Sequence, residues 1–532
     1  MDHFKLFDAN CRIGRHMKLS EKEPHTDSDL LAEMDRIGIC EALVIDSLSR
    51  ENHPLDGNER ILSITSKHPR LHPAWAAMPH APADEQLRGD DLIDTMKKNH
   101  VGALFFYPMQ YRFTLSDWAV DEFIEPVAAE KIPVFIDYNE VGSTMSCDQT
   151  DWEAVVNLCR RWPLLPVIVT ESRIRRGNRL IYRALDACPN LHIELGAYWL
   201  HRGIEYISKN FGAERLIFGS SWPGHGQSDT VATLTCAEIS DKEKYLIGGD
   251  NLRRLIKWCE PGHPTVILPE PADAYIAYGR SGVRPASLPA FADNHGHMGG
   301  RACHYHLPDC DLESITKDVR RLGIEKSIIF SFTGIFSDEQ PGNDRVSEAV
   351  AAYPELFIGL TMLNPHRGKD MMVSELERCH ALGHRGVKLI PTYQGYPLEG
   401  ANIDVACQWA HDHQQIILNH HWGSSEQMER LLKTYTKACF LTGHTTLQYA
   451  ELMKKYENLY VCSCPLLPPG MCQTVVDTIG ADRFMFGSDL QDLPIAWGLG
   501  PIIFSSISPA DKQLILGDNL RRVLARYSKE TR

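Results

Sequence analysis

The sequence predicts an α/β protein built from two tandem (β/α)8 TIM-like barrels. Three observations support this prediction: the chain has 532 residues, a set of motifs occurs twice, and each half contains eight short apolar, β-rich runs. A chain of this length exceeds what one hydrophobic core usually supports, so two domains are expected. Eight strand–helix alternations in about 250 residues are what a closed barrel of this kind requires.

The repeat consists of three pairs of matching segments. In the first pair, Phe-Asp-Ala-Asn-Cys-Arg-Ile-Gly corresponds to Ala-Asp-Asn-His-Gly-His-Met-Gly. The three pairs are 7–14 with 292–299, 215–221 with 483–489, and 249–254 with 517–522. Because the spacing between partners is roughly half the chain, the pattern indicates a duplicated domain and not a solenoid of short repeats.

The expected elements follow from these apolar runs. In the first half, strands are predicted near residues 4–9, 42–46, 72–77, 102–106, 133–137, 167–171, 192–196 and 216–220. In the second half, they are predicted near 291–295, 327–331, 357–363, 386–390, 416–420, 439–443, 460–464 and 484–489. Helix-like stretches such as 318–323 and 424–435 lie between them. The predicted domains are a first barrel over 1–260, a Pro-rich linker over 261–287 and a second barrel over 288–532.

Composition excludes several functional classes. The net charge of -14 argues against nucleic acid or an anionic membrane as a partner, since either favours a basic surface. The chain has no apolar run long enough to span a bilayer and no signal-peptide core near its first residue. Its 15 cysteines include no Cys-x-x-Cys pair, which suits a reducing compartment. We therefore expect a cytoplasmic protein that acts on a small molecule.

Polar side chains collect at the ends of the predicted strands in the second half. His295 and His297 are alternate residues of an extended segment, so their side chains share a face. Further polar residues at later strands are Lys388, His420, His444 and Asp489. Each one alone has an ordinary explanation, such as a buried histidine bonded to backbone or an aspartate that caps a helix. Their recurrence at the edge where barrel enzymes carry their sites instead predicts a metal centre.

These motifs resemble the amidohydrolase superfamily. The resemblance rests on Asp-x-His-x-His at 293–297, a histidine after the fifth strand, another after the sixth, and Phe-Gly-Ser-Asp at 486–489. The pattern is most similar to the amidohydrolase-related branch, which includes aminocarboxymuconate semialdehyde decarboxylase, lactonases and other hydrolases. The resemblance covers the second half by specific motifs and the first half by fold pattern only. It implies one divalent metal ion, zinc or alternatively manganese, bound by His295, His297, His420 and Asp489.

The same resemblance implies that His444 acts beside the metal as acid, base or electrophile. On chemical grounds, Asp489 can accept the proton of a metal-activated water, whose pKa falls toward about 7. Lys388 is expected to pair as a cation with a substrate carboxylate, and a carboxylated lysine between two metals is the alternative. Cys462 and Cys464 are expected to serve packing. Further candidates for substrate binding are His421, Trp422, Tyr393 and Arg367.

The first half repeats the fold pattern without the ligand set. Matched by sequence, Asn10 and Arg12 replace His295 and His297, while Leu104, Asp137, Ser172 and Ser221 replace Lys388, His420, His444 and Asp489. We therefore expect no metal in the first barrel and place the Arg12 guanidinium near the position of the cation. The basic run 173–176 is interpreted as a solvated loop.

The leading hypothesis is a metal-dependent hydrolase of a small ester, lactone or amide. The alternative is a non-oxidative, metal-dependent decarboxylase of a small unsaturated or aromatic acid, because the same ligands serve both reactions. A binding protein that has lost catalysis fits the first half but not the second. The first barrel is expected to form an intramolecular pseudo-dimer with the second, and further oligomerisation is left open.

Overall fold

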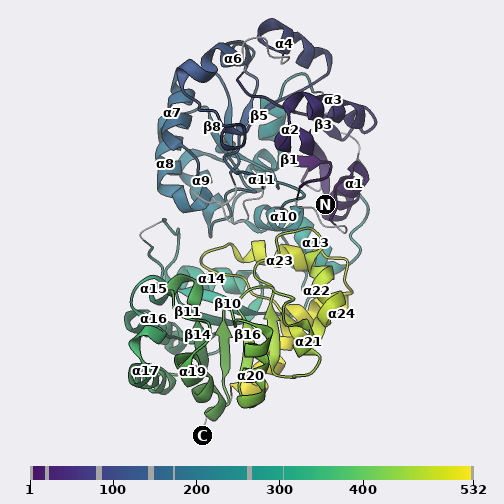
Figure 1. Ribbon diagram of the computed structural model, residues 1–532. Coiled ribbons are helices and arrows are strands. Elements are labelled where there is room, and N and C mark those ends of the chain that lie inside the picture. Colours follow the sequence, from purple (N-terminus) through teal and green to yellow (C-terminus); the bar gives the residue numbers. More distant parts are fainter. Residues whose placement is uncertain are drawn as a thin grey trace. The chain divides into compact units, whose positions relative to one another are not determined.

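The structure, a computed structural model, describes residues 4–17, 23–79, 87–141, 149–171, 174–259, 266–302 and 305–528. The chain forms two compact units, in each of which helices surround parallel strands (Figure 1). The first unit holds Met1–Ala272, Gly279–Gly282 and Cys303–His306. The second holds Asp273–Tyr278, Val283–Ala302 and Leu307–Arg532. Among the described residues, no helix is long and apolar enough to cross a bilayer.

The second unit is a closed barrel of eight parallel strands. The strands are β10 (Phe291–Met298), β11 (Ile324–Ser331), β12 (Phe357–Gly359) continued by β13 (Thr361–Met362), β14 (Gly386–Leu389), β15 (Ile416–Asn419), β16 (Cys439–Thr442), β17 (Leu459–Cys462) and β18 (Phe484–Met485). Each strand pairs with the next, and β12 and β13 are two parts of one strand because β12 pairs with β11 and β13 with β14. The backbone N–H of Asn294 donates to the Phe486 carbonyl at 2.9 Å, which joins the last strand to the first.

The first unit has the same strand order. Its strands are β1 (Leu6–Ile13), β2 (Ile39–Asp46), β3 (Leu71–Pro73) continued by β4 (Trp75–Ala76), β5 (Leu104–Phe106), β6 (Val134–Ile136), β7 (Val167–Val169), β8 (Leu191–Glu194) and β9 (Leu216–Ile217). The backbone N–H of Ala9 donates to the Phe218 carbonyl at 2.9 Å and closes this barrel in the same way. The predicted fold class is therefore confirmed, and the repeated topology is compatible with a tandem duplication.

Helices cover the outside of each barrel. Those that precede β10 are α1 (Asp27–Ile37), α2 (Ser47–Glu51), α3 (Pro54–Thr65), α4 (Gly89–Lys98), α5 (Pro108–Tyr111), α6 (Asp117–Ala129), α7 (Trp152–Arg161), α8 (Asn178–Ala187), α9 (Gly203–Phe211), α10 (Gln227–Cys236), α11 (Asp241–Tyr245), α12 (Asn251–Leu255) and α13 (Ala274–Ser281). The later ones are α14 (Leu312–Arg321), α15 (Thr333–Phe336), α16 (Glu339–Ala352), α17 (Lys369–Ala381), α18 (Pro391–Gln394), α19 (Ala401–Asp412), α20 (Ser425–Thr434), α21 (Ala450–Met453), α22 (Met471–Ile479), α23 (Ile495–Ile503), α24 (Pro509–Gln513) and α25 (Asn519–Tyr527).

Polar residues at the helix starts explain several boundaries. The Ser424 side chain accepts from the backbone N–H of Gln427, so α20 begins at the residue after this cap. Asp311 caps α14 in the same way, and this helix therefore starts six residues before the predicted stretch at 318–323. The π-helical turns Leu246–Asp250 and Leu514–Asp518 occupy equivalent places before α12 and α25, which extends the repeat to local geometry.

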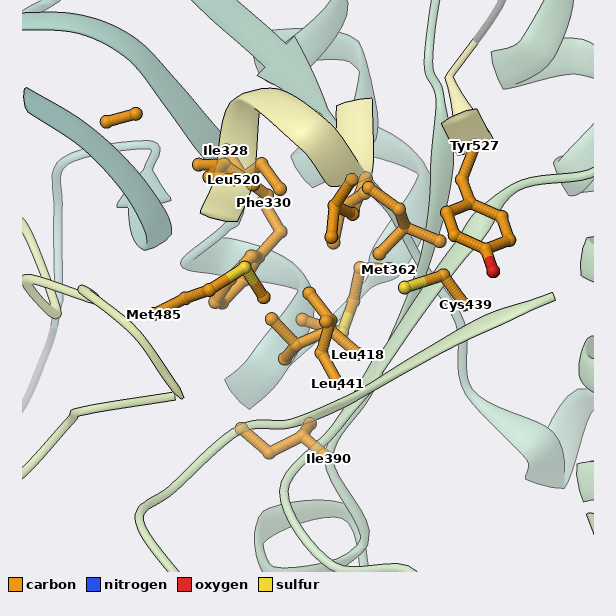
Figure 2. Close-up of a cluster of buried hydrophobic side chains, with 14 of the residues drawn as sticks. Ile328, Phe330, Met362, Ile390, Leu418, Cys439, Leu441, Met485, Leu520 and Tyr527 are labelled. Atoms are coloured by element: carbon orange, nitrogen blue, oxygen red, sulfur yellow. The ribbon is translucent and has the colours of Figure 1, made fainter. Parts of the chain in front are cut away.

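Alternate apolar side chains of successive strands fill the interior of the second barrel. Phe330, Met362, Leu418 and Leu441 belong to this core, and Leu520 and Tyr527 of α25 pack against it (Figure 2). Because strand side chains alternate between two faces, Lys388 lies on the same inward face as Ile390. The core thus extends toward the carboxyl ends of the strands, where the polar residues begin.

One buried carboxylate joins the first strand to the residues after the last strand in each unit. Asp293 accepts from the backbone N–H and the hydroxyl of Ser488, at 2.9 and 2.7 Å. Asp8 accepts from the same two groups of Ser220, at 3.0 and 2.5 Å. Burial raises the pKa of Asp293 to about 6, although these hydrogen bonds oppose the shift. The aspartate of the repeated motif therefore holds the barrel closed.

Part of the predicted linker is folded. Helix α13 lies within the span 261–287, of which residues 261–265 are outside the described residues. The rings of Tyr275 and Tyr278 lie 6.5 and 6.4 Å from the Phe291 ring, between centroids. The Asp273 carboxylate accepts from the Lys512 ammonium at 2.7 Å. These contacts attach residues 273–278 of the expected linker to the second unit.

Candidate metal centre

His295, His297 and Asp489 meet at the carboxyl edge of the second barrel. Their ligand atoms lie within 4.8 Å of one another, and within the described part of the chain no other group of three or more histidines, cysteines or carboxylates meets this criterion. The two rings come from β10, with their centroids 5.5 Å apart. Asp489 follows β18 and has a left-handed backbone, with φ of +56°. Two histidine nitrogens and a carboxylate oxygen suit zinc or manganese.

An irregularity in β10 directs the two imidazoles toward the same place. Between Asp293 and Gly296 the pairing with β11 shifts, so that β10 carries one residue more than its neighbour. This bulge lets Ala292 pack in the core below while His295 and His297 face the site above. The first unit has the same shift between Asp8 and Cys11, so the irregularity belongs to the repeated fold.

Buried ring nitrogens show that the residues fit a cation. His295 Nε2 lies 3.5 Å from Asp489 Oδ1. Neither this nitrogen nor His297 Nδ1 makes a hydrogen bond among the described residues, and both are buried. His297 Nε2 contacts Asp489 Oδ1 at 2.8 Å. Buried polar atoms without partners are uncommon in proteins, and metal binding would satisfy the His295 nitrogen.

The electrostatics favour the protonation states that metal ligands require. Burial lowers the pKa of His295 well below its usual range, and the nearby Lys388 lowers it further, so this imidazole is neutral. Burial alone would raise the pKa of Asp489, but the hydrogen bond from His297 holds it below its usual range. Neutral imidazoles and an ionised carboxylate are the forms that bind a divalent metal.

His420 and His444 lie beside this group. Their ring centroids are 4.3 Å apart, and that of His420 is 5.9 Å from the His295 ring. His420 does not belong to the group of three whose ligand atoms are mutually close, so its role as a fourth ligand stays a prediction. A Cβ at Gly443 would lie 2.8 Å from His420 Cδ2, which shows that glycine is needed there to admit the ring.

Lys388 is completely buried below the site. Its ammonium lies 4.1 Å from the centroid of the Phe330 ring, and it has no hydrogen-bond partner among the residues that the structure describes. Burial lowers the pKa of Lys388 to about 7, while the Asp489 charge opposes the shift. Pairing of this ammonium with a substrate carboxylate stays a prediction.

The other predicted substrate residues have different surroundings. His421 lines an open cavity of about 570 Å³ together with Glu399 and Tyr449. The Tyr393 ring is 47% exposed and lies 6.1 Å from the His420 ring. Arg367 is exposed, and its guanidinium donates to the Glu339 carboxylate at 3.1 Å.

The surroundings of Trp422 give no support to the prediction that it lines the pocket, which stays a prediction. This side chain is fully buried, and its indole N–H donates to the Leu441 carbonyl at 3.0 Å. Its ring packs against Phe440, with centroids 5.2 Å apart.

Several side chains at the site were missed or were assigned only to packing. The Phe330 and Phe332 rings lie 4.6 and 5.4 Å from the His297 ring and form an aromatic wall. Cys462 Sγ lies 3.8 Å from His295 Nδ1, so this thiol contacts a candidate ligand in addition to packing. The alternation of side chains in the second strand could have indicated Phe330. The position of Cys462 depends on contacts with a distant segment.

Strand pairing corrects two of the matches between the halves. The two barrels can be aligned by following the paired residues from strand to strand, starting from the last strand, which is part of the repeat. In this alignment Lys388 corresponds to Phe105 and not to Leu104, because Phe105 pairs with Phe135 and Ala76 on the neighbouring strands. The same count assigns His444 to Glu171. Ser172, which the sequence match had proposed, and Arg173 of the basic run lie outside the described residues.

The remaining positions of the first unit carry no metal ligand set. The Asn10 amide donates to Glu194 Oε2 at 2.9 Å and to the Ser221 hydroxyl at 3.1 Å. Arg12 Nη2 donates to the Ser221 carbonyl at 3.5 Å. The guanidinium of Arg12 therefore contacts the residue that replaces Asp489.

Comparison with known proteins identifies the same family that the sequence motifs resemble. A family model described as amidohydrolase matches residues 60–258 and 297–526, and so reaches both units. No curated protein matches the chain significantly.

Solved structures of low identity resemble one half of the chain. A putative amidohydrolase from Staphylococcus aureus is 14% identical, covers 44% of this chain and 99% of its own, and has a TM-score of 0.36. A 2,6-dihydroxybenzoate decarboxylase from Rhizobium is 16% identical, covers 45% of this chain and 99% of its own, and has a TM-score of 0.36. A 4-oxalomesaconate hydratase from Rhodopseudomonas palustris is 16% identical, covers 44% of this chain and 96% of its own, and has a TM-score of 0.34. Because the family model matches most of the sequence, the chain belongs to the amidohydrolase family.

Proposed function

We propose that the second unit is a metal-dependent hydrolase of a small ester, lactone or amide. The observation that carries this proposal is the group of His295, His297 and Asp489, with its unpartnered ring nitrogen, at the edge where barrel enzymes carry their sites. Zinc is the proposed metal and manganese the alternative, because both accept nitrogen and carboxylate ligands. A divalent cation there supplies Lewis acidity and makes water acidic near neutral pH.

The side chains around the ligands can bind substrate and move protons. Asp489 Oδ1 already accepts from His297 Nε2, so this carboxylate is oriented and can accept a further proton on its other oxygen. His444 is half-buried beside His420 and can donate a proton to a leaving group. We propose that the Lys388 ammonium attracts a carboxylate of the substrate.

Decarboxylation is the second candidate. The aromatic wall of Phe330 and Phe332 beside His297, together with the Lys388 ammonium, suits a planar unsaturated or aromatic acid. In that reaction His444 would deliver a proton to the carbon that loses carbon dioxide. In hydrolysis it would protonate a leaving oxygen or nitrogen.

Product analysis separates the two reactions. The full chain, loaded with zinc or manganese, is incubated with lactones, anilides and aromatic or enoic acids in water enriched in 18O. Incorporation of 18O without carbon dioxide supports the hydrolase, and carbon dioxide without 18O in the organic product supports the decarboxylase. The Asp489→Asn variant is the control and should abolish either signal. Turnover that persists unchanged in that variant would contradict both proposals.

A further inference from the structure

We propose that the first unit binds a small monocarboxylate at the carboxyl edge of its barrel, with Arg12 and Arg50 as the anion-binding side chains. This site is separate from the proposed metal centre and does not depend on it. The argument rests on two buried guanidinium groups that the described residues satisfy only in part.

Of the two guanidinium groups, that of Arg12 provides the stronger evidence. It lies near the end of β1, at the position that His297 occupies in the second unit, and it is only 8% exposed. A guanidinium carries five N–H donors. Within the described residues Arg12 makes one hydrogen bond, the long contact of 3.5 Å to the Ser221 carbonyl, and its Nε is buried without a partner. A buried charge with so few partners is costly unless an anion neutralises it.

Arg50 approaches the same edge from α2, directly after β2. It is also 8% exposed, and its Nη2 donates to the Asn139 carbonyl at 3.0 Å and lies 3.3 Å from the Asp137 carboxylate. Its Nε is again buried without a partner in the described part of the chain. The two side chains come from neighbouring strand ends, because Ile13 of β1 pairs with Asp46 of β2, directly before α2. Burial lowers the pKa of Arg12, and the charge of Arg50 lowers it further.

The carboxylates nearby are already engaged. Asp137 accepts from the backbone N–H and the side-chain amide of Asn139, at 2.8 and 2.6 Å, in addition to its contact with Arg50. Glu51 contacts His16 at 2.9 Å and accepts from the backbone N–H of Met17. Burial raises the pKa of Glu194 to about 8 and that of Glu171 to about 7, so near neutral pH the first carboxyl is mostly protonated and the second is partly protonated.

The chemistry of the edge selects the ligand. Guanidinium groups match the planar fork of a carboxylate, which can accept two parallel hydrogen bonds. The negative charge of Asp137 disfavours a dianion such as phosphate, so a single negative charge is preferred. The ring of Tyr107 lies beside this edge, with Arg50 Cζ 5.3 Å from its centroid. In place of metal ligands, the first unit thus carries a cationic group at the same strand end.

Titration of the full chain with sodium benzoate and sodium acetate tests this proposal. Sodium chloride and sodium phosphate at matched ionic strength are the reference anions, and the His295→Ala/His297→Ala background removes metal-dependent binding. Calorimetry should show that benzoate or acetate binds more tightly than either reference anion. Arg12→Gln and Arg50→Gln should each weaken the binding about tenfold or more. Arg183→Gln is the matched control, because this arginine is exposed and pairs with nearby Asp186 on the surface.

Melting without ligand separates binding from structure. If Arg12 is held for an anion, Arg12→Gln should melt at the same temperature as the parent or higher, because an underpaired buried charge is removed. A large fall in melting temperature would instead make Arg12 a structural residue and overturn the proposal. So would carboxylate affinity that equals that of chloride or phosphate, or that survives Arg12→Gln unchanged. If the double-alanine background does not fold, the same comparison is made between the wild type and Arg12→Gln.

Discussion

At the scale of single residues, the two units carry different side chains at positions that have the same backbone conformation. Asp489 and Ser221 both have left-handed backbones, with φ of +56° and +62°, although one is a candidate ligand and the other is not. Asp293 and Asp8 keep the same bonds to the serine after the last strand. Residues that shape the barrel are therefore retained in both units, while those that would hold a metal occur in the second alone among the described residues.

The metal ligands provide the first prediction. His295→Ala/His297→Ala should remove the bound metal, and Asp489→Asn should weaken it, because each change deletes or neutralises a donor of the group. Turnover should fall by several orders of magnitude. Metal content is measured by elemental analysis of purified protein, with His68→Ala in the first unit as control. Normal metal content in the double variant would show that the ion is held elsewhere.

His444 provides the second prediction. If it transfers a proton and does not bind the metal, His444→Ala should retain the ion and lose about 10²–10⁴ in kcat. Steady-state kinetics and metal analysis on the same sample check both parts. A variant that loses its metal would identify His444 as a ligand and would favour the two-metal arrangement with a carboxylated Lys388.

The third prediction concerns pH and Glu194 in the first unit. Burial raises the pKa of Glu194 from an ordinary 4.5 to about 8. Between these values the folded chain keeps a proton that the unfolded chain has lost, so stability falls as pH rises. Glu194→Gln cannot ionise, and its loss of melting temperature from pH 5 to pH 8 should be smaller than in the wild type.

The control for that prediction is Glu243→Gln. Hydrogen bonds from Ser240 lower the pKa of Glu243, so this group contributes to stability above its unfolded value and loses that contribution only at acidic pH. The change from pH 5 to pH 8 should therefore match the wild type. An equal change in Glu194→Gln would mean that Glu194 is ionised in the folded chain throughout.

At the scale of elements, short structural features position the site more than long helices do. The bulge in β10 turns both imidazoles to one side, and Gly443 after β16 leaves room for the His420 ring. Helix α13 illustrates the same principle away from the site. It begins one residue after Asp273, which neutralises the completely buried ammonium of Lys512.

The ion pair before α13 provides the fourth prediction. Asp273→Ala should destabilise the second unit by about 3 kcal/mol, because it removes the carboxylate that neutralises the completely buried ammonium of Lys512. Chemical denaturation measures the change. The double variant Asp273→Ala/Lys512→Met removes both charges and should recover part of the loss. If the single variant is as stable as the wild type, the pair does not hold this segment to the unit.

At the scale of the whole molecule, the question is why a barrel without the metal ligand set accompanies one that has it. The family model reaches both units, which agrees with their common strand order. We propose that they form an intramolecular pseudo-dimer, in which the first unit covers an apolar face of the second. Selection for packing without selection for metal binding would preserve strands and closing bonds while the ligand positions changed.

Separate expression of the second unit provides the fifth prediction. The fragment 286–532 should aggregate or self-associate and should recover when the first unit is added, as measured by size-exclusion chromatography with light scattering. The fragment 266–532 is the control, since it retains Asp273 and Tyr275 and so isolates the effect of the missing partner. If 266–532 is a monomer with full activity, the first unit has another purpose, and the carboxylate site is then the leading candidate.

The sequence by itself determined the barrels, their order and the residue types of the centre. Apolar runs and repeated motifs are local properties, so their spacing was enough to place the strands and to select His295, His297 and Asp489. Only the tertiary structure decided which of the candidates meet. The contact between His297 and Asp489 joins residues 192 positions apart, and strand pairing assigned Phe105 to the position of Lys388. Trp422 turned into the core for the same reason: burial is set by contacts between distant segments, which a linear pattern does not contain.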